Sequence, residues 1–151
     1  NTGGYEAAVL AWLGEAVPAA ERALGAERIR LILNFIQPND AGAAPWLARQ
    51  VAARRFPPTV LVDYHNYFNW AGDHPRAEFA EGVCAWGQWW TPYVRSGLRV
   101  LIGEWSLATA LDHYDAGLDD DETARFLRVF YANQASAYLT GASGHFYWNF
   151  R

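Results

Sequence analysis

The chain has 151 residues, of which 52% are hydrophobic and 19% are charged. This balance is typical of one folded domain and excludes an extended disordered segment. The net charge of −4 without a basic stripe argues against nucleic acid as a partner, and no apolar run approaches the ~20 residues that a membrane span needs. Cys84 is the only cysteine, so an internal disulfide is excluded, and we expect this side chain to be a small buried hydrophobe on a helix.

Aromatic residues are frequent, at 16% of the chain with eight tryptophans. Several of them fall at the predicted ends of strands or in loops. Indole rings in such places can stack on the C–H faces of sugars, whereas the simpler interpretation is ordinary packing in the core. For any single tryptophan the packing interpretation is the better one, so aromatic content alone assigns no function.

The first half of the chain predicts two helices and two strands. Residues 5–24 are rich in alanine with spaced large apolar residues, and we expect a helix that Pro18 kinks or divides. Residues 29–36 predict a strand, and residues 45–54 a helix with proline in its first turn. A second buried strand is expected at residues 59–64, after two prolines break the chain.

The second half repeats this order. Residues 75–94 predict a helix that is interrupted near Gly87 and Pro92, and residues 98–103 a third strand. A long loop is expected from 106 to 120, followed by an amphipathic helix over 121–139 and a fourth strand over 144–150. The chain is therefore expected to run helix–strand four times over.

Strands separated by helices of this length favour parallel pairing through right-handed crossovers, which is the α/β class. No glycine-rich phosphate loop follows any of the strands, so a nucleotide-binding fold is poorly supported. Four parallel strands are half of a TIM (β/α)8 barrel, and a four-stranded open sheet would leave two edges unpaired. We therefore expect residues 1–151 to form a single half-barrel domain of four helix–strand units that is completed by association.

Chemistry-bearing side chains gather at the carboxyl ends of the predicted strands, which meet on one face of a parallel sheet. In chain order they are Asn34 and Gln37; Asp63, His65, Tyr67, Asn69 and Trp70; Glu104 and Trp105; and Trp148 and Asn149. Of these, Glu104 is the candidate catalytic nucleophile, because an unpaired carboxylate at the end of a buried strand is costly unless it has a function. We expect Asn69, Trp70 and Trp105 beside it to contact substrate.

A carboxylate nucleophile beside indole rings is a plausible set for the hydrolysis of a sugar. A retaining glycosidase also needs a second carboxyl group ~5–5.5 Å from the nucleophile. The sequence offers no clear acid, because Asp63 is flanked by buried residues and Asp40 lies in a loop without a supporting pattern. The histidines His74, His113 and His145 have no metal-ligand spacing, and the acidic run at 119–122 is better explained by the start of a helix. We therefore expect no metal and no cofactor.

Three motifs together resemble glycoside hydrolase family 5, and within it the exo-β-1,3-glucanase branch. They are Val-Asp-Tyr-His-Asn-Tyr-Phe at 62–68, Leu-Ile-Gly-Glu-Trp-Ser-Leu-Ala at 101–108 and Gly-His-Phe-Tyr-Trp-Asn-Phe at 144–150. Their order and spacing are similar to those of strands six to eight of the family's (β/α)8 barrel, with residues 29–36 as strand five. The resemblance covers nearly the whole chain but only the carboxyl-terminal half of that barrel.

The resemblance implies a role for each matching residue. Glu104 matches the nucleophile at the end of strand seven, and His65 and Tyr67 match the pair after strand six that orients it. Trp148 matches the tryptophan of strand eight that stacks under the sugar. The implied activity is hydrolysis of β-glucosidic linkages, in β-1,3-glucan or a related β-glucan oligosaccharide or polysaccharide, by a retaining mechanism. The implied location is secreted or periplasmic.

The family's acid/base glutamate lies in an Asn-Glu-Pro motif after strand four, and this chain contains no such motif. The acid would then come from a partner, either a second copy in a homodimer or a missing N-terminal half-barrel. The alternatives are a catalytically inactive half-barrel that binds glucan, and a self-assembling scaffold or fragment without hydrolytic activity.

Overall fold

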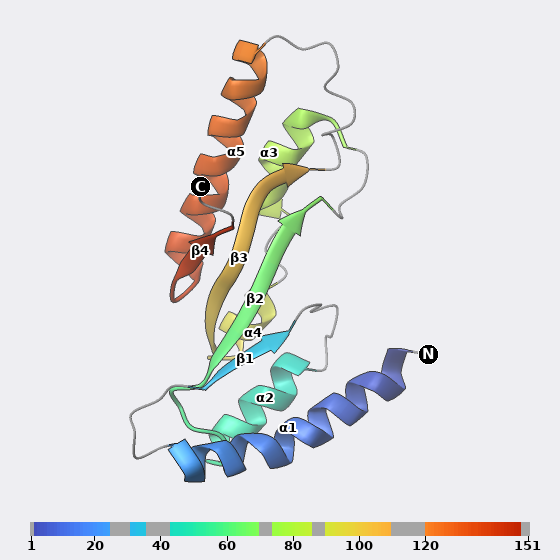
Figure 1. Cartoon of the computed structure of the whole chain (residues 1–151), viewed down its shortest axis with the longest axis vertical. Helices are drawn as coiled ribbons and strands as arrows, with labels where there is room; N and C mark the ends of the chain where they lie inside the picture. Colours follow the sequence, from blue (N-terminus) through green and yellow to red (C-terminus); the bar gives the residue numbers. More distant parts are fainter. Residues whose placement is uncertain are drawn as a thin grey trace. The chain divides into compact units, whose positions relative to one another are not determined.

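The computed structural model describes residues 2–24, 31–35, 43–69, 74–85, 90–109 and 120–148 (Figure 1). The elements are α1 (Thr2–Leu24), β1 (Ile32–Phe35), α2 (Ala43–Ala52), β2 (Leu61–Phe68), α3 (Arg76–Ala85), α4 (Thr91–Arg95), β3 (Arg99–Thr109), α5 (Asp120–Gly141) and β4 (His145–Tyr147). The strands form one four-stranded parallel sheet in the order β1-β2-β3-β4. The predicted α/β class and the alternation of helices with parallel strands are confirmed.

By their internal contacts the residues group into two compact units. Unit 1 comprises Asn1–Asp63 and Trp90–Val100, and unit 2 comprises Tyr64–Trp89 and Leu101–Arg151. The prediction of a single domain stays a prediction. Among the helices that the structure describes, none is long and apolar enough to cross a membrane.

Unit 1 has a core in which α1 and α2 contribute apolar faces. Leu13 and Val17 of α1 are buried, as is Leu47 of α2. Trp46 of α2 meets Phe56 edge-on, with ring centroids 5.6 Å apart. The helix α1 is continuous through Pro18, so the predicted division into two helices is not seen.

The helix α2 ends two residues before the predicted position because of its capping geometry. The backbone N–H of Arg55 donates to the carbonyl of Gln50 at 2.9 Å, and that of Arg54 to Val51 at 3.0 Å. This pattern is a Schellman motif, in which the residue after the helix takes a left-handed conformation. Arg54, with φ of 55°, occupies that position where glycine is usual.

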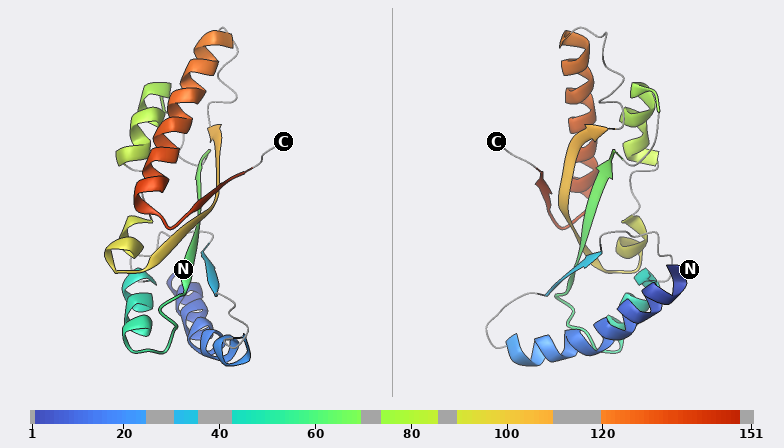
Figure 2. Two further views of the ribbon diagram at one scale, coloured as in Figure 1. Left: turned by 90° about the vertical axis from the view of Figure 1, so that its left-hand side faces the viewer. Right: turned by 45° about the vertical axis from the view of Figure 1, so that its right-hand side comes forward.

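In unit 2, the described helices α3 and α5 both lie on one side of the strands, as the left-hand view of Figure 2 shows. Phe130 of α5 packs edge-on against Phe68 of β2 and Phe79 of α3, with centroids 5.1 and 6.3 Å away. The Asn133 side-chain amide also donates to the Ala80 carbonyl at 2.7 Å, which ties α5 to α3. This apolar layer leaves the opposite face of the unit 2 strands for the polar residues.

Two strands are longer than the sequence predicts. The strand β2 continues four residues past its predicted end, and β3 continues six residues past its own. Hydrophobic runs locate the buried part of a strand, and both strands continue where polar residues begin to alternate with apolar ones. His65, Tyr67 and Glu104 therefore lie inside strands, where pleating sets their direction.

Cys84 is exposed on α3, so the prediction of a buried cysteine is wrong. The neighbouring Val83 and, four residues before it, Phe79 take the buried positions of this helix. The cysteine falls beside the buried stripe, outside the face that packs on α5.

Candidate functional site

Buried and partly exposed side chains alternate along the second half of β2. Tyr64, Asn66 and Phe68 are buried, whereas the residues between them are partly exposed. Because successive side chains of a strand point to opposite faces, His65 and Tyr67 lie together on the face that α5 does not cover. The buried partners behind them hold the strand against the helix layer.

The strand β3 reaches the same face through a bulge. In its parallel pairing with β4, Ile102 lies opposite His145 and Trp105 opposite Tyr147, so three steps on β3 match two on β4. Ile102 and Trp105 are both fully buried, which strict alternation would not permit for residues three apart. The extra residue lets Glu104 stay partly exposed between them, and bulges are over-represented next to active sites.

The carboxylate of Glu104 is held at one of its two oxygens. The Tyr67 hydroxyl donates to Oε2 at 2.8 Å. His65 Nδ1 lies 3.4 Å from the same oxygen. Oε1 receives neither contact. His65, Tyr67 and Glu104, predicted as one site, are thus brought together in unit 2.

The electrostatics around Tyr67 keep its phenol protonated. Its pKa is raised well above the ordinary value of 10.0, first by desolvation on burial and then by the hydrogen bond to Glu104 and the negative charge of that carboxylate. A phenol that keeps its proton remains a hydrogen-bond donor to Glu104 Oε2.

A cavity of about 540 Å³ opens beside this cluster. It is lined by Tyr67, Asn69, Ser106, Leu107, Ala108, Tyr147 and Trp148. Trp148 is 56% exposed, and the buried Oδ1 atom of Asn69 has no hydrogen-bond partner among the residues that the structure describes. The cavity therefore offers an accessible indole, which suits a ligand with apolar C–H faces.

Trp105 does not belong to this cavity. Its side chain is 0% exposed, so it offers no surface on which a sugar could stack, and the structure moves it from the predicted substrate-binding set to the core. The indole packs against Tyr138 and Tyr147 with centroids 5.2 and 5.0 Å away. Its Nε1–H donates to His145 Nδ1 at 3.2 Å, which leaves the proton of a neutral imidazole on Nε2.

No carboxylate, Glu104 included, is among the residues that line the cavity, and the cavity reaches Glu104 only through its hydrogen-bond partner Tyr67. Asp63 belongs to unit 1, where its Oδ2 accepts a hydrogen bond from Asn34 Nδ2 at 3.1 Å. The predicted site residue Trp70, together with Gln37, Asp40 and Asn149, lies outside the described residues. In the described part of the chain, no cluster of three or more histidine, cysteine or acidic side chains could hold a metal ion.

Sequence reasoning missed Ser106, Leu107, Ala108 and Tyr147 as lining residues. It assigned the first three to a loop, but β3 continues to Thr109 and carries them along the cavity. The alternation of small and apolar residues after Trp105 is the signal that could have found this extension.

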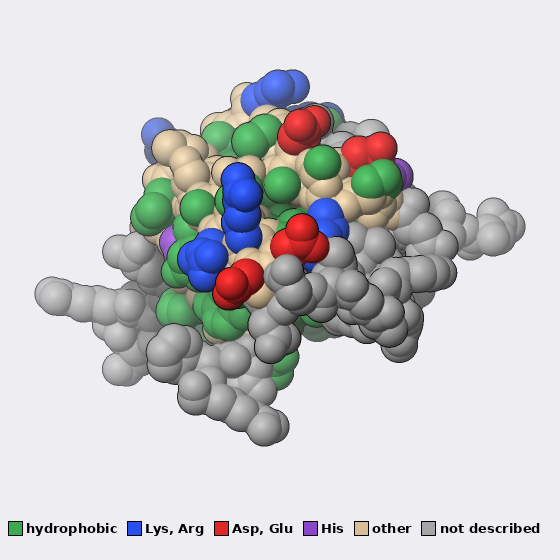
Figure 3. Space-filling view, turned by 90° about the horizontal axis from the view of Figure 1, so that it is seen from above, with side chains coloured by type: hydrophobic (Ala, Val, Ile, Leu, Met, Phe, Trp, Pro, Cys, Tyr) green, Lys and Arg blue, Asp and Glu red, His purple; other side chains and the backbone are tan. Residues whose placement is uncertain are grey.

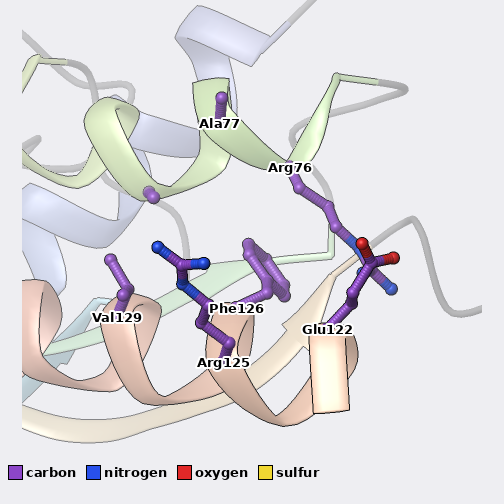
Figure 4. Close-up of a pocket in the computed structure, with 7 residues that line it drawn as sticks. Arg76, Ala77, Glu122, Arg125, Phe126 and Val129 are labelled. Atoms are coloured by element: carbon purple, nitrogen blue, oxygen red, sulfur yellow. The ribbon is translucent and has the colours of Figure 1, made fainter. Parts of the chain in front are cut away.

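A separate cavity of about 400 Å³ lies between α3 and α5 (Figure 4). The Arg76 guanidinium lies 5.3 Å from the Phe126 ring centroid, and its Nη2 donates to Thr123 Oγ1 at 3.4 Å. In the face drawn in Figure 3, arginine side chains are interspersed with acidic and hydrophobic ones. The contacts of Arg76 fasten two helices together, and they lie on the side of the strands away from Glu104.

Comparisons of this chain with protein-family models, with characterised proteins and with solved structures found no match. The assignment of a function therefore depends on the geometry and chemistry of the residues around Glu104.

Proposed function

We propose that this chain carries the nucleophile side of a retaining glycoside hydrolase site that acts on β-glucosidic linkages, in β-1,3-glucan or a related β-glucan. The observation that carries the proposal is the asymmetric environment of Glu104. Tyr67 and His65 both engage Oε2, so the carboxylate is oriented while Oε1 is left for a new bond. A carboxylate prepared in this way fits attack on an anomeric carbon.

The chemistry divides into two displacements. Oε1 of Glu104 forms a bond to the anomeric carbon as the bond to the glycosidic oxygen breaks, and that oxygen takes the electron pair and a proton from a general acid. Water then attacks the same carbon, gives up a proton to the conjugate base, and releases Glu104. Tyr67 holds the carboxylate through both steps, because its retained proton keeps donating to Oε2.

The sugar would lie in the cavity beside Glu104. Trp148 supplies an exposed indole for the C–H face of a pyranose. The lining residues supply no general acid. In this proposal the fold is half of a TIM (β/α)8 barrel, and the acid comes from a second copy of the chain or from an N-terminal half-barrel, in a secreted or periplasmic protein.

The test uses a substrate that needs no acid. The reagent 2,4-dinitrophenyl 2-deoxy-2-fluoro-β-glucoside has a leaving group that departs without protonation, and its fluorine slows hydrolysis of the glycosyl–enzyme ester. We expect intact-mass measurement to show one fluoroglucosyl group per chain, and peptide mapping to place it on Glu104. Glu104→Gln is expected to abolish labelling. The matched control Glu78→Gln, at an exposed glutamate of α3, is expected to label as the parent does.

Failure of the folded parent protein to react, or labelling at another residue, would contradict the assignment of Glu104.

A second candidate is a glucan-binding protein without hydrolytic activity. It is favoured by the lack of any carboxylate among the residues that line the cavity. Calorimetry with laminari-oligosaccharides would then show binding that Trp148→Ala abolishes, with neither labelling of Glu104 nor release of product.

A further inference from the structure

A chain of buried hydrogen bonds lies directly behind the candidate site in unit 2. Asn66 Nδ2 of β2 donates to the Tyr138 hydroxyl at 2.6 Å, and that hydroxyl donates to Gln134 Oε1 at 2.9 Å. Gln134 Nε2 then donates to the backbone carbonyl of Ser106 in β3 at 3.1 Å. Two side chains one turn apart on α5 thus connect β2 to β3.

The side chains of Asn66, Tyr138 and Gln134 are withdrawn from water, whereas Ser106, whose backbone carbonyl accepts the last bond, also lines the cavity. Gln134 is 0% exposed, and Asn66, Tyr138 and Ser106 are also buried. Four polar groups in one core would be costly if any of them lost its partner. A simple apolar core would avoid that cost. Hydrogen bonds are directional, however, and they fix the relative positions of β2 and β3 more narrowly than apolar contacts do.

The two ends of the chain coincide with the two halves of the candidate site. Asn66 lies between His65 and Tyr67 in the pleat of β2. Ser106 lies two residues beyond Glu104, just after the bulge has interrupted the register between β3 and β4. Fixing Asn66 and Ser106 relative to each other therefore fixes the distance between the Tyr67 hydroxyl and Glu104 Oε2.

We infer that Gln134 and Tyr138 are positioning residues, which act through Asn66 and Ser106 to hold Tyr67 in hydrogen-bond contact with Glu104. Gln134 and Tyr138 would hold the Tyr67–Glu104 contact whether or not the protein has an activity. The effect on glycosyl transfer rests on the proposed function. A purely structural role would predict that loss of the chain lowers stability without disturbing the Tyr67–Glu104 contact.

The experiment reads the contact directly by fluorine NMR. The protein is prepared with 3-fluorotyrosine, whose phenol is more acidic than that of tyrosine, and the Tyr67 resonance is assigned with Tyr67→Phe. Glu104→Gln defines the titration midpoint of Tyr67 without the carboxylate. We expect Tyr138→Phe and Gln134→Met to lower this midpoint by about one pH unit, a tenfold change in the ionisation equilibrium, toward the Glu104→Gln value.

The matched control is Tyr93→Phe, which removes the hydroxyl of an equally buried tyrosine in unit 1 and is expected to leave the Tyr67 midpoint unchanged. An unchanged midpoint in both folded network variants would overturn the inference. The fluoroglucoside is the second readout, with labelling of both variants expected to slow about tenfold, as loss of about 1.4 kcal/mol in the transition state requires. If the parent protein is not labelled, the proposed function fails, while the titration still decides the positioning role.

Discussion

The two oxygens of the Glu104 carboxylate have different surroundings. Oε2 is engaged by a phenol and an imidazole, and Oε1 by neither. Both contacts come from residues that strand pleating places on one face of β2, and the bulge in β3 brings Glu104 to that face. At this scale the site is specified by three side chains, all in unit 2.

Tyr138 gives a prediction about pH and stability. Burial raises its pKa well above 10.0, while the hydrogen bond from Asn66 acts in the opposite direction. Below pH 10 both the folded and the unfolded protein hold the proton, so the contribution to stability is constant. Above pH 10 only the folded state keeps it, and the free energy of unfolding falls as the pH rises.

We therefore expect Tyr138→Phe to reduce the loss of stability between pH 9 and 11 by about 1.4 kcal/mol in total, measured by urea unfolding at each pH. The exposed Tyr131→Phe serves as the control and is expected to keep the slope of the parent protein. Equal slopes for the parent and Tyr138→Phe would contradict this prediction.

Among the elements of unit 2, α5 does most to support the site. One face of this helix packs Phe130 against β2 and α3, and the next turns supply the buried polar chain. The strand β3 contributes the bulge that turns Glu104 away from the helix. The site thus depends on α5, although none of the residues that contact Glu104 or line the cavity belongs to this helix.

Phe130 tests this dependence. We expect Phe130→Ala to lower the free energy of unfolding by ~3–5 kcal/mol, because it removes a fully buried ring and leaves a cavity between three aromatic neighbours. Val129→Ala, at the adjacent but exposed position, is expected to cost no more than ~0.5 kcal/mol. Urea unfolding measures both, and similar values for the two variants would refute the packing described for α5.

The sequence predicts the order of the elements well because helices and strands differ in hydrophobic period. It places Glu104, His65 and Tyr67 near one another because parallel strands end on one side. It does not predict that β2 and β3 continue through these residues, since the bulge at Glu104 breaks the simple alternation. Nor does it distinguish the buried Trp105 from the exposed Trp148, because burial depends on which rings of other elements pack around each indole.

At the scale of the whole molecule, β1 and β4 are the outer strands of the described sheet. Parallel sheets in α/β proteins are normally covered on both faces, yet both described helices of unit 2 lie on one side of its strands. Outer strands with free backbone groups are also sites at which another strand can pair. These features support the proposal that the fold is completed by association.

Light scattering across a concentration series tests completion by a second copy. We expect a mass of twice 16.9 kDa that does not fall on dilution through the micromolar range. If the dimer forms, a mixed dimer of Glu104→Gln with the parent chain would be used to search for the acid that one copy supplies to the other. A monodisperse monomer would refute self-completion, and an N-terminal half-barrel would then have to supply the acid.

The bulge in β3 also favours one register of pairing between β3 and β4. If β3 slipped by one residue along β4, the charge of Glu104 would turn under the rings of α5 and the indole of Trp105 would turn toward water. Burying an unpaired carboxylate costs several kcal/mol, and exposing an indole forfeits a further ~2 kcal/mol or more. The bulge that keeps Glu104 accessible therefore also disfavours the slipped register, because that register would bury the charge of Glu104 and expose the indole of Trp105 at the same time.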